Sequence, residues 1–109
     1  MQIEERSLGD VVILDVKGEM TSEERVELLK EKADSLIGQG HKKIVLNLAD
    51  VPYMDSAGLG VLVRMLTMAS RHGGSVKLVN LRERVEKLLT ITKLLSIFVL
   101  RSASEGESE

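Results

Sequence analysis

One serine has neighbours that suit it for chemistry. Ser56 lies within residues 54–60, MDSAGLG, directly before an apolar helical pattern. A serine at this position can cap the helix by accepting a hydrogen bond from its first backbone N–H groups. The start of a helix also favours negative charge, so a phosphate on Ser56 is compatible with the fold. The spacing therefore permits a structural cap, a phosphate acceptor, or both.

A catalytic serine is a third interpretation, and two features argue against it. A nucleophile elbow has the pattern Gly-x-Ser-x-Gly, whereas Met54 stands two positions before Ser56. The two histidines, His41 and His72, fall in predicted loops away from the strand ends where Ser56 lies. Neither is placed to act as the general base that a serine nucleophile needs. We therefore predict that the protein is not an enzyme.

The same residue types argue against a metal or cofactor site. The chain has no cysteine and two well-separated histidines, a poor basis for a transition-metal site. Asp50 and Asp55 flank one loop and could hold Mg²⁺, but a local cap and a surface role explain them more simply. The chain has no P-loop. We predict no metal and no cofactor.

The composition further narrows the class of protein and its partners. The 109 residues are 43% hydrophobic, enough for one domain with its own core. The formal net charge is −2, and the chain has one Tyr, one Phe and no Trp, so a nucleic-acid partner is not expected. No stretch approaches the roughly 20 apolar residues of a membrane span, and residues 1–6 lack a signal-peptide pattern. We expect a cytoplasmic protein with no membrane insertion.

The elements that must position Ser56 follow from hydrophobic periodicity. Strand patterns alternate with helix patterns in the order β-β-α-β-α-β-α-β, which predicts an α/β fold with a mixed, mostly parallel sheet and helical cover. The predicted strands cover 2–7, 11–16, 43–48, 76–79 and 97–100, and the predicted helices run from a cap at Thr21 to Gly38 and over 57–71 and 82–92. In such a sheet the loops after the second and third strands meet at one edge, where binding sites gather.

The predicted elements have recognisable apolar faces. Thr21 and Glu24 match a capping box at the start of the first helix. The strand over 43–48 is nearly continuous in apolar residues, which predicts a central strand covered on both faces. The core candidates of the first and third helices are Val26, Leu29, Ala33, Leu36 and Ile37, and Val85, Leu88, Leu89 and Ile91.

The helix that begins near Ser56 has two further peculiarities. The first half of this helix is apolar almost all round, which is typical of a helix that is buried on every side or covered by a partner. The pattern is therefore compatible with a homodimer. Gly58 and Gly60 fall in its first turns, where each glycine costs about 1 kcal/mol relative to alanine. Close approach of another backbone, or of a partner chain, would account for them.

Residues 45–62, VLNLADVPYMDSAGLGVL, resemble the signature segment of STAS domains, the family of sulfate transporters and anti-sigma factor antagonists. The resemblance is strongest to the stand-alone bacterial anti-sigma factor antagonists, and it covers about residues 3–100. Weaker matches are GEM at 18–20, GG at 73–74 and VNL at 79–81. The resemblance implies a STAS-like fold over residues 1–101. Residues 102–109 have the composition of a disordered acidic tail.

The resemblance also implies a mechanism. Ser56 aligns with the family's phosphoacceptor, and the partner is an anti-sigma factor with serine kinase activity. The unphosphorylated antagonist binds this partner and releases a sigma factor; phosphorylation prevents binding, and a serine phosphatase reverses it. The implied partner-binding residues are Met20, Thr21, Tyr53, Met54, Asp55, Ser56, Ala57, Gly58, Leu59 and Gly60. The alternative is an accessory or scaffolding STAS subunit of a transporter or stress-signalling complex.

Two positions depart from the family pattern. Many members have Asp where this chain has Thr21, so no carboxylate is expected beside the Ser56 loop from that residue. Members often have Thr-Gly-Leu after the third helix, whereas this chain has Thr92, Lys93 and Leu94. The glycine that would end the helix is missing, so we expect the helix to continue or to end differently.

Overall fold

The structure is a computed structural model that describes residues 1–93. Its elements are β1 (Gln2–Leu8), β2 (Val11–Lys17), α1 (Glu23–Gly38), β3 (Lys43–Asp50), α2 (Ser56–Arg71), β4 (Ser75–Val79) and α3 (Glu83–Ile91). Over this range the order agrees with the predicted one. The predicted last strand at 97–100, the domain boundary at 101 and the predicted acidic tail lie outside the described residues.

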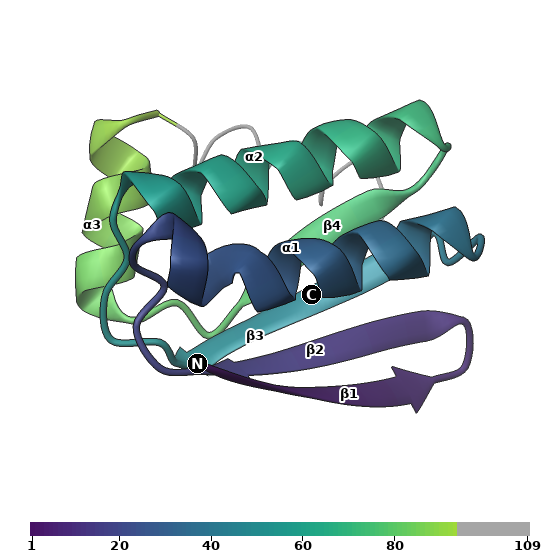
Figure 1. Ribbon diagram of the computed structural model, residues 1–109, viewed down its shortest axis with the longest axis horizontal. Helices are drawn as coiled ribbons and strands as arrows, with labels where there is room; N and C mark the ends of the chain where they lie inside the picture. Colours follow the sequence, from purple (N-terminus) through teal and green to yellow (C-terminus); the bar gives the residue numbers. More distant parts are fainter. Residues whose placement is uncertain (94–109) are drawn as a thin grey trace.

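The four strands form one sheet in the order β1-β2-β3-β4 (Figure 1). β1 and β2 pair antiparallel through a tight turn in which Gly9 adopts a φ of 62°. β2 pairs parallel with β3, and β3 pairs parallel with β4. The prediction of a mixed, mostly parallel sheet is confirmed. Because the last three strands run the same way, their carboxyl ends share one edge, and the loops that follow them lie together.

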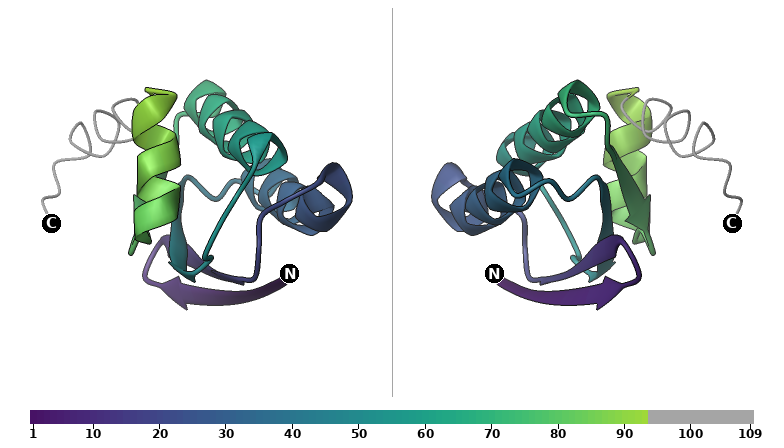
Figure 2. Two further views of the ribbon diagram at one scale, coloured as in Figure 1. Left: turned by 90° about the vertical axis from the view of Figure 1, so that its left-hand side faces the viewer. Right: turned by 90° about the vertical axis from the view of Figure 1, so that its right-hand side faces the viewer.

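Helices α1 and α2 lie side by side over one face of the sheet (Figures 1 and 2). The predicted core residues of α1 are all buried beneath that contact. Along β3, Ile44, Leu46 and Leu48 are buried, whereas Val45 and Asn47 are half-buried. The prediction that this strand is covered on both faces is therefore confirmed for one face only. The alternation is that of a strand with one face packed against the core.

Helix α3 stands at the end of the sheet where β3 and β4 finish (Figure 1). Val85 and Leu89 are buried and Leu88 is half-buried, as predicted, but Ile91 is 76% exposed. The prediction that Ile91 belongs to the core is wrong. At about 100° per residue, Ile91 lies on the side of the helix away from Val85 and Leu89.

Helix α3 ends without a glycine. Thr92 is the C-cap, and Lys93 adopts a φ of 65°, in the left-handed region that glycine normally occupies at helix ends. The helix therefore ends at Ile91 without a glycine, with a lysine in a conformation that is unfavourable for an L-residue.

Lys93→Gly is therefore expected to stabilise the protein by about 1 kcal/mol, because glycine adopts a positive φ without steric cost. Chemical denaturation followed by circular dichroism measures the change. Lys87→Gly, in the middle of the same helix, is the control and should destabilise by about 1 kcal/mol. Equal losses in the two variants would contradict the assignment of strain to Lys93.

Candidate functional site

Two loops join at the carboxyl edge of the sheet and hold the start of α2. The loop after β2 and the loop after β3 run parallel: Gly18 N–H donates to the Asp50 carbonyl at 3.0 Å, and Met20 N–H donates to the Tyr53 carbonyl at 3.0 Å. Asp55 N–H returns a bond to the Met20 carbonyl at 3.2 Å. Residues 18–20 and 50–55 therefore form one rigid unit, as the strand order predicted.

The centre of this unit is a buried contact between Met20, Met54 and Gly58. Met20 and Met54 are paired as a parallel bridge, and their exposed fractions are 0% and 1%. A Cβ on Gly58 would lie 2.5 Å from the Met20 carbonyl oxygen. Close approach of a backbone within the chain therefore explains Gly58. All three residues are among the predicted partner-binding residues, and their burial gives them a role in packing this turn. That they also contact a partner stays a prediction.

Asp55, not Ser56, is the N-cap of α2. Its backbone is extended, and its Oδ1 accepts hydrogen bonds from Ala57 N–H at 2.9 Å and Gly58 N–H at 3.4 Å. Ser56 is instead the first residue of the helix, and its side chain is exposed. The prediction that Ser56 caps the helix is wrong by one position, since aspartate and serine are equally good caps and stand next to each other.

The second oxygen of Asp55 reaches the other loop. Oδ2 accepts a hydrogen bond from Ser22 N–H at 3.1 Å. Ser22 is the N-cap of α1: its Oγ accepts from Arg25 N–H at 3.3 Å. The predicted capping box of Thr21 and Glu24 is therefore wrong, because the helix begins one residue later. The carboxylate beside Ser22 comes from Asp55 and not from position 21.

Ser22 has an unusual backbone conformation. Its φ of 63° and ψ of 147° lie in a region that residues with a side chain rarely adopt. Its N–H is held by Asp55, and its carbonyl accepts from Val26 N–H at 3.2 Å. A strained residue thus lies directly beside the loop that presents Ser56. Sequence reasoning missed Ser22, although a Ser three residues before Arg25 was a visible alternative cap.

The hydrogen bonds to Asp55 change its titration. The Ser22 N–H, followed by those of Ala57 and Gly58, holds the pKa of the Asp55 carboxyl below its usual 3.8, against the opposing effect of desolvation. Asp55 is therefore charged at neutral pH. It adds a fixed negative charge beside Ser56 and satisfies helix N–H groups that Ser56 was expected to satisfy.

Because the folded pKa of Asp55 is lowered, its contribution to stability is complete above about pH 4. The contribution is lost as the pH falls through the folded pKa. Asp55→Asn should lower the melting temperature by roughly 5 °C at pH 7, since the amide has one acceptor oxygen for three donors. The difference from wild type should shrink below pH 4. Thermal melts from pH 2.5 to 7 test this. Glu23→Gln is the control: Glu23 is an exposed carboxylate at the start of α1, and its substitution should change the melting temperature much less at pH 7.

The surface around Ser56 continues into a groove between α1 and α2. The groove has a volume of about 380 Å³, and its lining residues are Glu23, Val26, Glu27, Lys30, Ser56, Ala57, Gly60, Val61 and Arg64. Gly60 lies there with nothing within 4 Å of where its Cβ would be. Packing among residues 1–93 does not explain this second glycine. The α1 residues of the groove were missed, because sequence alone does not show which side of α1 faces α2.

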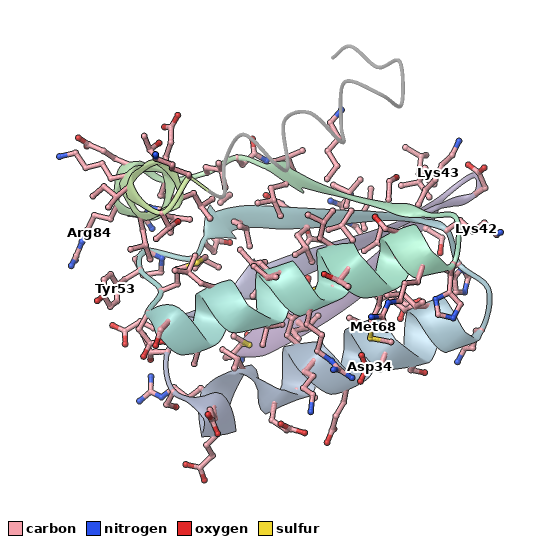
Figure 3. The ribbon with its side chains drawn as sticks, turned by 90° about the horizontal axis from the view of Figure 1, so that it is seen from above. Asp34, Lys42, Lys43, Tyr53, Met68 and Arg84 are labelled. Carbon is pink, nitrogen blue, oxygen red and sulfur yellow. The ribbon has the colours of Figure 1, made fainter. Side chains whose placement is uncertain are left out.

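The remaining predicted contact residues are accessible. Thr21, Asp55, Ala57 and Leu59 are half-buried, while Tyr53, like Ser56 and Gly60, is exposed. The guanidinium of Arg84 lies over the Tyr53 ring at 4.5 Å from its centroid, a cation–π contact that joins α3 to the loop (Figure 3). Arg84 is a further site residue that the sequence did not reveal.

The histidines do not join this site. His72 follows the last turn of α2, so about 24 Å of helix separates it from Ser56. His41 lies in the loop before β3, at the opposite edge of the sheet.

Within residues 1–93, no group of three or more His, Asp or Glu side chains could hold a metal ion. In the same range, no helix is both long enough and apolar enough to cross a membrane.

Comparisons with known proteins agree with this geometry. The family model described as "STAS domain" matches residues 2–107. An anti-sigma-B factor antagonist of Bacillus subtilis (strain 168) is 46% identical over 79 residues, 72% of each chain. A putative anti-sigma factor antagonist of Thermotoga maritima is 40% identical over 87 residues, covering 80% of this chain and 77% of its own.

Solved structures show the same fold. The crystal structure of a putative anti-sigma factor antagonist from Thermotoga maritima superposes with a TM-score of 0.82 at 38% identity, covering 87% of this chain and 81% of its own. The Bacillus cell fate determinant SpoIIAA in its phosphorylated form superposes with a TM-score of 0.70 at 22% identity, covering 84% of this chain and 83% of its own. At that identity the likeness to SpoIIAA concerns the fold alone.

Proposed function

The chain belongs to the STAS domain family, and on this basis we propose that it is an anti-sigma factor antagonist that binds its anti-sigma factor through the surface around Ser56. The observation that carries the proposal is the placement of Ser56. It is the exposed first residue of α2, on a loop pair fixed by backbone hydrogen bonds. The names of relatives 40–46% identical support the same assignment.

The surface beside Ser56 has the character of a protein contact. Leu59 and Val63 are one turn apart on α2, and Val63 is 38% exposed. Gly60 lies between them with open space around it. A partly apolar strip next to an exposed hydroxyl suits a macromolecular partner better than a small ligand. The partner therefore lies against the first turns of α2, in the cytoplasm where a sigma factor acts.

Phosphorylation of Ser56 by the partner's kinase activity is the switch. The Ser56 hydroxyl is free for transfer because Asp55 already caps the helix. A phosphate adds about −1.5 to −2 charges at neutral pH. It projects toward the partner and not into the core, so the fold is retained and binding is lost. A serine phosphatase would restore the binding form.

Incubation of the protein with the candidate anti-sigma kinase and ATP, followed by intact-mass measurement, tests the proposal. One phosphate should be added to the wild type and none to Ser56→Ala. Thr67→Ala is the matched control: Thr67 is another exposed hydroxyl on α2, and its loss should leave phosphorylation unchanged. Full phosphorylation of Ser56→Ala would contradict the switch, and a wild type that does not bind the anti-sigma factor would contradict the antagonist assignment.

A further inference from the structure

A second pocket lies at the edge of the sheet opposite Ser56. It has a volume of about 450 Å³ and is lined by three segments: the β1–β2 hairpin, residues 40–43 before β3, and residues 73–75 before β4. These segments are the amino ends of the parallel strands. The pocket is thus separated from the Ser56 surface by the length of the sheet, and the proposed antagonist function does not use it.

The walls of this pocket are backbone held at close range. Ser75 N–H donates to the Lys42 carbonyl at 2.7 Å, and a Cβ on Gly74 would overlap that same carbonyl oxygen. Gly40 and Gly73 have φ values of 94° and 75°, which a side chain would make unfavourable. Glycines therefore shape part of the cavity wall, and Lys42 and Lys43 also line it.

The charge at the pocket is positive although the whole chain has a net charge of −2. Lys42 and Lys43 line it together with one carboxylate, Asp10, which lies 3.6 Å from the Lys43 ammonium. Lys42 makes no ion pair within residues 1–93, and its Nζ lies 3.5 Å from where a Cβ of Gly73 would be. Figure 3 shows Lys42 and Lys43 at the end of the molecule away from Tyr53 and Arg84.

We propose that this pocket binds the phosphate group of a small soluble phosphate monoester. Lysine ammonium groups bind phosphate as point charges, and the hydroxyls of Ser7 and Ser75 on the lining are further donors. The volume lies within the range of small-molecule sites and exceeds that of a phosphate alone, which leaves room for a small organic body. Among residues 1–93, Asp10 is the one carboxylate on the lining, which is too few oxygen ligands for a divalent cation.

The test is a titration of the full-length ¹⁵N-labelled protein with inorganic phosphate and with glycerol 3-phosphate at constant ionic strength. Amide signals of residues 40–43 and 73–75 should shift and reach saturation, with glycerol 3-phosphate binding more tightly than phosphate. Lys42→Gln should weaken binding about ten-fold, the effect of losing one charged hydrogen bond. Asp10→Asn should strengthen it, because it removes the one negative charge of the pocket.

Lys87→Gln, an exposed lysine on α3, is the matched control and should bind like the wild type. Melting temperatures confirm that each variant is folded. Shifts that stay linear with concentration, or a Lys42→Gln protein that binds as tightly as wild type, would overturn the proposal. Co-sedimentation with vesicles of phosphatidylglycerol and phosphatidylcholine distinguishes a soluble phosphate monoester from a lipid headgroup. Vesicle binding that depends on Lys42 would show that the pocket binds a lipid headgroup and would overturn the proposal of a soluble ligand.

Discussion

Gly58→Ala is expected to lower the free energy of unfolding by about 1–3 kcal/mol. The added Cβ would lie 2.5 Å from the Met20 carbonyl oxygen and about 3.0 Å from the Met54 Cβ. Both neighbours are buried, and the Met20 carbonyl accepts the Asp55 N–H, so neither can move without disturbing the cap of α2. The cost of overpacking exceeds the gain of about 1 kcal/mol that alanine brings to a helix.

Gly60→Ala is the matched control for this experiment. The substitution is the same and falls two residues further along the same helix, but the new methyl group meets nothing within 4 Å. We expect the free energy of unfolding to rise by about 1 kcal/mol. Urea denaturation of both variants measures the contrast. A destabilised Gly60→Ala protein, or a Gly58→Ala protein as stable as the wild type, would contradict the packing described for this turn.

Ser56→Asp is expected to weaken binding of the anti-sigma factor about ten- to hundred-fold while leaving the fold intact. A new negative charge would stand next to Asp55 on a surface that is partly apolar, and an unpaired charge of this kind costs several kcal/mol when a partner covers it. Within the free protein the same charge is tolerated, because it lies at the first position of α2, where the helix dipole favours it. Titration calorimetry measures the affinity and circular dichroism checks the fold.

Thr67→Asp is the control for the added charge. Thr67 is exposed on α2, eleven residues after Ser56, so it faces the same direction about 16 Å further along the helix. Its affinity should stay within about three-fold of the wild type. Equal losses in the two aspartate variants would show that total charge, and not the position of Ser56, controls binding. Ser56→Ala should bind like the wild type and resist the switch.

Much of the scaffold was predictable from local patterns. The α1 core positions, including Val26 and Leu29, are buried as predicted, because helical periodicity alone identifies one face of an isolated helix. The parallel arrangement of β2, β3 and β4 followed from the alternation of strand and helix patterns. Ile91 was mispredicted because hydrophobicity was weighed above its angular position on α3.

The site was predictable as a region and not in its details. Asp55 and Ser56 are adjacent residues with equal capping ability, and only the backbone geometry of the loop determines which of them lies outside the helix. The family resemblance implied that Met20 and Met54 are partner-binding residues. Their burial results from the pairing of two loops that lie more than 30 residues apart in the chain.

The two glycines of α2 also separate what the sequence shows from what only the tertiary structure shows. From the sequence, Gly58 and Gly60 destabilise the helix equally, because helix propensity depends only on residue type. Close approach of another backbone or of a partner chain could account for either glycine. The tertiary structure distinguishes them, since α2 is turned so that Gly58 meets the Met20 carbonyl and Gly60 faces open space. The sequence by itself placed Ser56 within one residue of a helix start at the carboxyl edge of the sheet. Only the tertiary structure decided that Asp55 supplies its cap and bonds to Ser22 in the neighbouring loop, because those bonds depend on how two distant loops meet.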